Sequence, residues 1–165
     1  MTGLRTNVAD LLHHPGSRRT LHLEQPVSGL QTSGAGVPDT EPLVLDVALE
    51  RVSEGIVARG QASGQWSAQC SRCLVPIERP FTVTFSELFE ETPIDDETYP
   101  LQDETIDLEL PVRDAILLDL PLLPLCKEDC VGLCPICGTD RNLETCDCVV
   151  DESDSRWSAL KDLNL

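Results

Sequence analysis

Eight cysteines at short spacings constrain this sequence more than any other feature. Their pattern is C-x2-C, then 52 residues, then C-x3-C-x3-C-x2-C-x8-C-x-C. Two residues between cysteines let a tight turn present both sulfurs to one ion, and tetrahedral Zn²⁺ takes four such ligands. The run Cys134-Pro135-Ile136-Cys137-Gly138 indicates such a turn strongly, because Pro fixes φ and Gly permits positive φ. The eight thiolates therefore predict two zinc sites of four cysteines each.

The cost of closing a loop favours grouping ligands that are close in sequence. The predicted local site consists of Cys134, Cys137, Cys146 and Cys148, which lie within 15 residues. The predicted long-range site consists of Cys70, Cys73, Cys126 and Cys130. A rival grouping, a zinc ribbon that joins Cys70 and Cys73 to Cys134 and Cys137, stays open. With all four positions filled by protein, each site is expected to be structural rather than catalytic.

Two other uses of the cysteines compete with structural zinc. A thioredoxin-like redox pair is expected at a helix start near a βαβ unit, whereas Cys70 and Cys73 lie between expected antiparallel strands. An iron–sulfur cluster also takes four cysteines, but nothing in the sequence supplies a redox-partner site. Both remain alternatives to zinc.

Motifs of catalysis are missing from the sequence. It contains no G-x-S-x-G, no phosphate-binding Gly loop and no H-E-x-x-H, and its three His all lie within the first 22 residues. We therefore expect a protein that is not an enzyme.

The cysteine content and the apolar pattern bear on the compartment. Eight cysteines among 165 residues fall below the roughly 8–10% typical of small disulfide scaffolds. The sequence shows no run of 18 apolar residues and no apolar stretch of a secretory signal near its start. A cytoplasmic location is expected, where thiols stay reduced and clustered cysteines favour metal binding.

Charge is distributed unevenly along the chain. The net charge is −17, of which residues 1–80 carry −1 and residues 81–165 carry −16. Ten acidic residues and no Lys or Arg lie between Phe81 and Pro111. Direct binding of nucleic-acid phosphate needs a basic surface, so this half favours a basic protein partner or a solvated acidic loop over Glu87–Glu104.

Residue patterns predict an α+β fold in one domain: an antiparallel β-meander with one or two short helices and a cysteine-rich, zinc-bound C-terminal segment. Apolar and polar residues alternate over 43–50, 55–64, 66–70 and 77–85, as in half-buried strands. Val112–Leu120 has helical periodicity, with Pro111 in the first turn. The expected parts are an N-terminal helix and the pair Arg18-Arg19 (1–24), a flexible linker (25–42), strands, acidic loop and helix (43–125), a metal-binding segment (126–150) and a C-terminal tail or helix (151–165).

Several motifs occur together in one order over residues 8–163. They are Pro15-Gly16-Ser17-Arg18, Cys70-Ser71-Arg72-Cys73-Leu74, Ile106-Asp107-Leu108, Ala115-Ile116-Leu117-Leu118-Asp119-Leu120-Pro121, Cys130-Val131-Gly132-Leu133-Cys134-Pro135-Ile136-Cys137-Gly138 and Asp154-Ser155-Arg156-Trp157-Ser158-Ala159-Leu160. This set resembles the bacterial and chloroplast YceD family, and the double-knuckle C-terminus resembles its actinobacterial branch. Ser155 departs from the Pro that the family more often has.

The resemblance implies a function in accumulation or processing of 23S ribosomal RNA, and so in large-subunit biogenesis. Because a strongly acidic protein is repelled by phosphate, our hypothesis is an indirect link to the RNA. The acidic surface Glu87–Glu109 would bind a basic ribosomal protein or a precursor particle. One alternative is direct RNA contact through the arginines of the less acidic half, namely Arg5, Arg18, Arg19, Arg51, Arg59, Arg72 and Arg79. Another is a thiol-redox protein.

Overall fold

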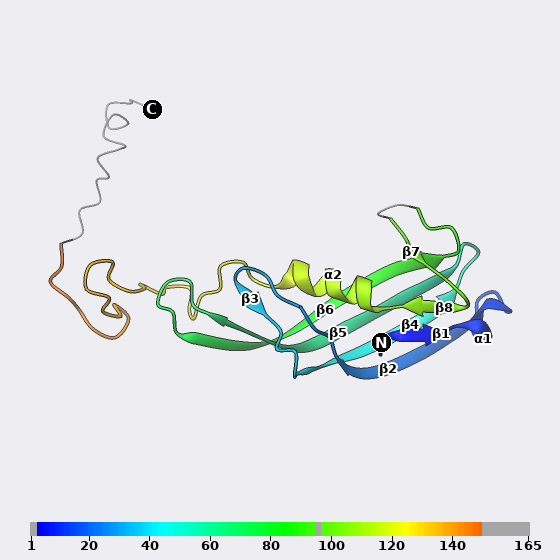
Figure 1. The fold of residues 1–165 in the computed structure, drawn as a ribbon, viewed down its shortest axis with the longest axis horizontal. Helices are drawn as coiled ribbons and strands as arrows, with labels where there is room; N and C mark the ends of the chain where they lie inside the picture. Colours follow the sequence, from blue (N-terminus) through cyan, green and yellow to red (C-terminus); the bar gives the residue numbers. More distant parts are fainter. Residues whose placement is uncertain (1–2, 95–96, 150–165) are drawn as a thin grey trace, which may run out of the picture.

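One long, mostly antiparallel sheet forms the body of this α+β protein (Figure 1). The computed structural model describes residues 3–94 and 97–149. The sheet contains β2 (Arg18–Pro26), β3 (Ala35–Gly36), β4 (Pro42–Arg51), β5 (Ile56–Gln69), β6 (Pro76–Glu90) and β7 (Tyr99–Pro100). Its order is β2-β4-β5-β6-β7, with β3 also beside β5, and only β6 and β7 run parallel. A second, small sheet pairs β1 (Arg5–Asn7) with β8 (Thr105–Asp107).

The predicted antiparallel strands are present, but two of them form one continuous strand. Residues 55–64 and 66–70 belong to the single strand β5 rather than to two strands. The expected break at Gly64 is absent because Gly64 lies opposite Phe81, and a Cβ there would lie only 3.1 Å from a carbon of that ring. Gly60 lies opposite Phe85 in the same way. These glycines leave room for aromatic rings on the sheet surface, so they do not end the strand.

Alternation of side chains gives the sheet one buried face. In β4, Leu43, Leu45, Val47 and Leu49 are buried, and the residues between them face outward. The register places the buried side chains of β6, including Val83, on the same face. All these residues belong to one hydrophobic core.

Two helices accompany the sheet, α1 (Ala9–Leu12) and α2 (Glu109–Asp119). The prediction of a helix over Val112–Leu120 is confirmed, and Pro111 lies in its first turn, where a missing N–H costs little. Val112 and Ile116 are buried on the core side of α2, whereas Leu118 is 88% exposed. Neither helix in the described ranges is long and apolar enough to cross a membrane.

Residues 25–42 do not form the linker that their Gly, Ser, Thr and Pro content predicts. Val27, Leu30 and Val37 are buried, and β2 and β3 include part of the segment. Arg113 of α2 donates hydrogen bonds to the carbonyl oxygens of Ser28 and Gly29, at 2.9 and 3.2 Å. The composition was misleading because a few apolar side chains and these backbone contacts hold the segment over the core.

Other boundaries differ from the prediction as well. The N-terminal helix is a single turn, and Arg18-Arg19 begins β2. The acidic segment Glu87–Glu104 is not wholly a solvated loop, because Phe89 and Leu101 are buried and β6 and β7 take part of it. The predicted C-terminal helix lies outside the described residues.

Leu30→Ala tests whether segment 25–42 belongs to the core. Leu30 is 0% exposed, so we expect the free energy of unfolding to fall by about 2–4 kcal/mol, as for other buried leucines. Leu118→Ala, at an exposed position, is the matched control and should change it by about 0.5 kcal/mol or less. Equal denaturant midpoints for the two variants would show that the segment is a linker after all.

Candidate metal centres

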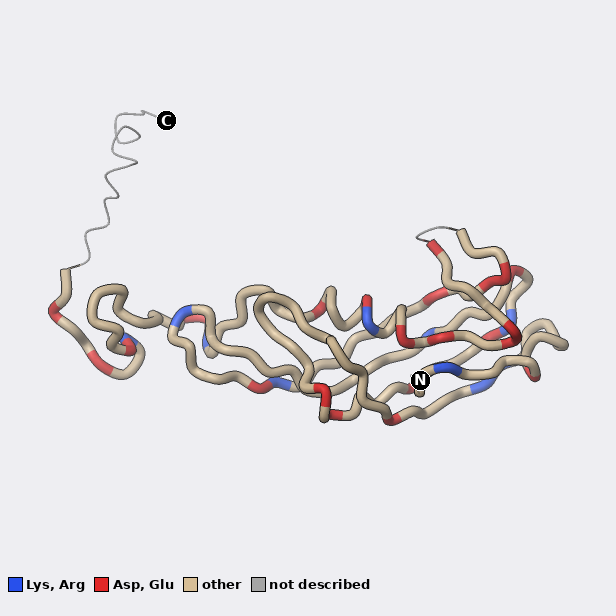
Figure 2. The backbone as a smooth tube through the Cα atoms, in the orientation of Figure 1, with Lys and Arg blue, Asp and Glu red and all other residues tan. Residues whose placement is uncertain are grey.

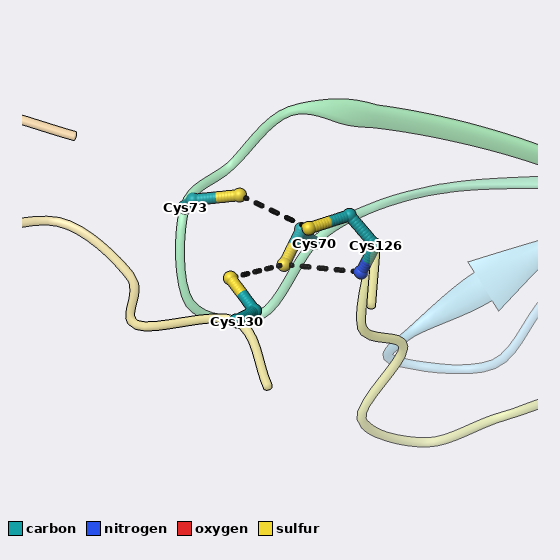
Figure 3. Close-up of side chains that lie close together, drawn as sticks. All are labelled: Cys70, Cys73, Cys126 and Cys130. Carbon is teal, nitrogen blue, oxygen red and sulfur yellow. Dashed lines mark hydrogen bonds between the residues drawn. The ribbon is translucent and has the colours of Figure 1, made fainter. Parts of the chain in front are cut away.

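The first cluster comprises Cys70, Cys73, Cys126 and Cys130 (Figure 3). Cys70 and Cys73 lie in the turn that joins β5 to β6. In that turn the amide of Leu74 donates to the Cys70 carbonyl at 2.9 Å, and Leu74 adopts a left-handed φ of 61°. The turn brings both sulfurs to the same side, as the C-x2-C spacing predicts.

Cys126 and Cys130 come from the segment that follows α2. The amide of Ser71 donates to the Pro124 carbonyl at 2.8 Å, which fixes this segment beside the turn. Arg79 of β6 donates to the carbonyls of Leu125 and Cys126, at 3.1 and 2.9 Å. Arginine side chains and backbone amides therefore bring cysteines that are far apart in sequence together.

Distances within the first cluster fit four thiolates around one ion. The Sγ atoms of Cys70 and Cys130 lie 3.8 Å apart, and those of Cys73 and Cys126 lie 3.6 Å apart. A tetrahedron with metal–sulfur bonds of about 2.3 Å has sulfur–sulfur edges of about 3.8 Å. A disulfide bond needs about 2.05 Å. The cluster is thus shaped for a metal ion, and three of its cysteines are buried.

The second cluster comprises Cys134, Cys137, Cys146 and Cys148, whose ligand atoms also lie within 4.8 Å of one another. Its first pair repeats the turn of the first cluster. The amide of Gly138 donates to the Cys134 carbonyl at 2.9 Å, and Gly138 has a φ of 75°. Gly138 thus occupies the position in this turn that Leu74 occupies in the turn of the first cluster. The second cluster is more open, since only Cys134 is buried and Cys137 is exposed.

The two clusters are joined by Asn142, which the sequence analysis did not single out. Asn142 lies between ligands of the second cluster, yet its Nδ2 donates to the sulfur of Cys130 in the first cluster at 3.5 Å. Its Oδ1 accepts from the amide of Val131 at 2.9 Å. An isolated Asn in a cysteine-rich segment gives no sequence signal for such a role, because the contact depends on how the two loops pack.

Hydrogen bonds and burial divide the thiols by proton affinity. Burial raises the pKa of Cys70, but hydrogen bonds from the backbone amides of Cys73, Cys126 and Arg72 outweigh it and lower the pKa to about 6. Hydrogen bonds from the hydroxyl and the amide of Thr139 lower the pKa of Cys137 to about 6. Burial raises the pKa of Cys126 to about 12. In the second cluster the hydrogen bond with Cys137 raises the pKa of Cys148 to about 12. Each cluster therefore needs a cation before all four of its cysteines ionise together.

The structure forms the grouping that loop closure favoured and does not form the rival zinc ribbon. Each of the eight predicted residues lies in one of the two clusters. Two cationic side chains near the first cluster have partners of their own: Arg72 donates to the Cys130 carbonyl at 2.7 Å, and Lys127 contacts Asp129 at 3.9 Å. Arg79, which the sequence did not indicate as a support of the metal site, donates in the same way to the carbonyl of Cys126.

The chain is similar to a known protein family and to several bacterial proteins. A profile described as "Large ribosomal RNA subunit accumulation protein YceD" matches residues 58–164. An uncharacterized protein of Mycobacterium tuberculosis is 35% identical over 170 residues, with 97% of this chain and 81% of the relative covered. The uncharacterized protein YlbN of Bacillus subtilis is 32% identical over 106 residues, with 61% and 62% covered.

A plant protein named "Large ribosomal RNA subunit accumulation protein YCED homolog 1, chloroplastic", from Arabidopsis thaliana, is 31% identical over 65 residues. The alignment covers 39% of this chain and 20% of that protein. No solved structure matches the chain significantly.

Removing one ligand from each cluster tests their separate contributions. We expect two metal ions per chain in the parent protein and one in Cys73→Ser or Cys137→Ser, by elemental analysis. Cys73→Ser should lower the free energy of unfolding by at least about 2 kcal/mol more than Cys137→Ser does. The reason is that the first cluster joins core segments, so the free energy of metal binding there contributes to folding. Ser71→Ala, in the same turn, is the control. Equal metal content in Cys73→Ser and Ser71→Ala would contradict the assignment.

Asn142→Ala tests the link between the clusters. Loss of the donor to Cys130 should speed release of the ion from the first cluster to a chelator by about tenfold, as removal of outer hydrogen bonds does at other metal sites. Thr145→Ala, an exposed position in the same loop, should leave the rate unchanged. Identical release kinetics in both variants would show that Asn142 has no such effect.

Proposed function

The chain belongs to the YceD family, and we propose that it is a non-catalytic factor that supports accumulation of 23S ribosomal RNA and biogenesis of the large ribosomal subunit. It acts by binding a basic ribosomal protein or a precursor particle, so that its link to RNA is indirect. The proposal places it in the cytoplasm, where its thiols stay reduced.

This proposal rests on one observation: the arginines that could bind RNA already form ion pairs or hydrogen bonds within the chain. All seven arginines of residues 1–80 have a partner within the chain. They are Arg5 with Asp107, Arg18 and Arg59 with Glu50, Arg19 with Asp10, Arg51 with the Gly55 carbonyl, Arg72 with the Cys130 carbonyl and Arg79 with the Leu125 and Cys126 carbonyls. A phosphate backbone would have to displace these contacts. The cost is small for the exposed ion pairs of Arg5, Arg18 and Arg59, and larger for Arg72 and Arg79, whose hydrogen bonds hold the segment of the first cluster.

Most of the described acidic residues between Phe81 and Pro111, by contrast, have no cationic partner in the described chain. Figure 2 shows them gathered where β6 ends and around β7, β8 and the start of α2. Among the described acidic residues of this segment, only Asp107 and Glu109 form ion pairs, with Arg5 and Arg113. The resulting negative field attracts basic proteins and speeds their association.

Zinc is the metal that best suits the two clusters in this proposal. Four thiolates within 4.8 Å of one another enclose a single tetrahedral ion and leave no space for an iron–sulfur cluster. All four positions are then filled by protein, so the ions stabilise the fold and take no part in a reaction. Metal analysis of protein purified without chelator distinguishes zinc from a single iron.

A thiol-redox function is the second candidate, favoured by the lowered pKa of Cys70. Reactive cysteines are partly exposed, whereas Cys70 is 0% exposed and lies in a strand-to-strand turn rather than at a helix start. Metal binding explains the same hydrogen bonds to the sulfur. The redox candidate predicts that the native protein reduces a disulfide substrate, and the proposed function predicts that it does not.

Binding to purified components tests the proposed function. We expect the protein to bind basic large-subunit proteins in a salt-sensitive manner and to bind naked 23S RNA weakly. The double variant Arg18→Ala/Arg19→Ala should keep its affinity for the basic proteins. Tight binding of the RNA, lost in this variant with a salt slope smaller by about 2, would overturn the proposal in favour of direct contact.

A further inference from the structure

β6 has an open edge beside α2. It pairs with β5 from Pro76 to Phe89, but on its other side the described residues provide only β7, which pairs at Phe89 and Glu90. The outer edge of residues 76–88 therefore pairs with no other strand of the described chain. An open edge presents unpaired N–H and C=O groups and is a template for another strand.

A groove of about 610 Å³ follows this edge. We call it the β6–α2 groove, and it is lined by Thr84–Glu87 of β6, by Glu97–Tyr99, and by Pro111, Asp114, Ala115 and Leu118 of α2. Figure 1 shows α2 lying along β6. The exposed Leu118 marks one end of the groove with an apolar side chain that no described residue covers.

Three carboxylates face the β6–α2 groove, and no Lys or Arg is among its lining residues in the described chain. Glu87 and Asp114 form no ion pair with any described residue, and Asp114 accepts a hydrogen bond from the Tyr99 hydroxyl at 3.0 Å. Burial and the nearby Asp114 raise the pKa of Glu87. Burial and Asp114 raise the pKa of Tyr99 to about 12. Burial is the larger cause of both shifts, and the smaller part that comes from Asp114 reflects a negative potential that a bound cation would relieve.

We propose that the β6–α2 groove binds an extended, basic segment of a partner protein, which adds to the open edge of β6 as a further strand. Side chains alternate along an added strand, so every second residue faces the groove. A Lys or Arg there pairs with Glu87 and Asp114, and an apolar residue contacts Leu118. This inference rests on the proposed function, because it names how a basic partner docks.

Other occupants fit the groove less well. Nucleic acid would meet three carboxylates and no cation among the described lining residues. A second copy of the chain, pairing edge to edge, would bring its own acidic groove against this one. The main-chain bonds of strand addition supply affinity and the pockets for alternate side chains supply selectivity, which suits a basic ribosomal protein with an extended segment.

The first test uses charge variants of equal net charge. Glu87→Gln/Asp114→Asn removes two carboxylates of the groove, and the matched control Glu91→Gln/Asp103→Asn removes two exposed ones outside it. We expect the groove variant to bind basic large-subunit proteins at least about tenfold more weakly, as when a charge in a partly desolvated pair loses its partner. The control should change less than about twofold, in line with exposed charges.

The second test asks whether the ligand adds as a strand. The probe is a synthetic peptide that alternates lysine and valine, and its control is the same peptide N-methylated at alternate backbone nitrogens. We expect the parent peptide to slow amide hydrogen exchange at alternate residues of Thr82–Leu88, and the methylated peptide to have no such effect. Equal binding of both peptides without this protection would overturn strand addition.

The outcomes separate the two proposals. Equal losses in both charge variants would refute the groove but leave the proposed function standing on general electrostatics. Failure of the unmodified protein to bind any basic ribosomal protein would refute both. A dimer that disappears in the groove variant would make a second copy the occupant and overturn the inference. Thermal unfolding of each variant checks that the fold is intact.

Discussion

The first cluster is the contact on which the rest of the structure depends. It fastens the β5–β6 turn to the segment that leaves α2, across 52 intervening residues between Cys73 and Cys126. In the chain-entropy description, closing a loop of that size removes about 4 kcal/mol of freedom from the unfolded chain. Cys70, Cys73 and Cys130 also belong to the hydrophobic core, so ligation and apolar burial stabilise the same contact.

The second cluster packs directly against the first. Asn142 reaches back to Cys130, and the amide of Leu133 donates to the Arg72 carbonyl at 3.0 Å. Gly132, with φ of 79°, lies where a Cβ would come within 3.0 Å of that same carbonyl oxygen. The local cluster is therefore oriented by contacts with the long-range one, although its own four ligands need no distant residue.

Metal binding and acidity occupy different parts of the molecule. The first cluster lies at the β5–β6 turn and the second is packed against it, whereas the acidic segment surrounds the other end of β6 and the start of α2 (Figures 1 and 2). This separation lets the ions stabilise the fold while most of the described carboxylates at the opposite end, all except Asp107 and Glu109, have no cationic partner in the described chain. Arg113 of α2 pairs with Glu109 and donates hydrogen bonds to the carbonyls of Ser28 and Gly29, so it holds segment 25–42 over the core.

The sequence by itself determined what depends on short range: the alternation of β4, the periodicity of α2, the two cysteine turns and the grouping of Cys134, Cys137, Cys146 and Cys148. Spacing and φ preferences act over a few residues, so they can be predicted without a fold. Only the tertiary structure decided the burial of Leu30, the merging of two strands across Gly64, the reach of Asn142 and Arg79, and the open edge of β6 beside Asp114. Each of these depends on which distant segment lies opposite, and that is set by packing and register rather than by local pattern.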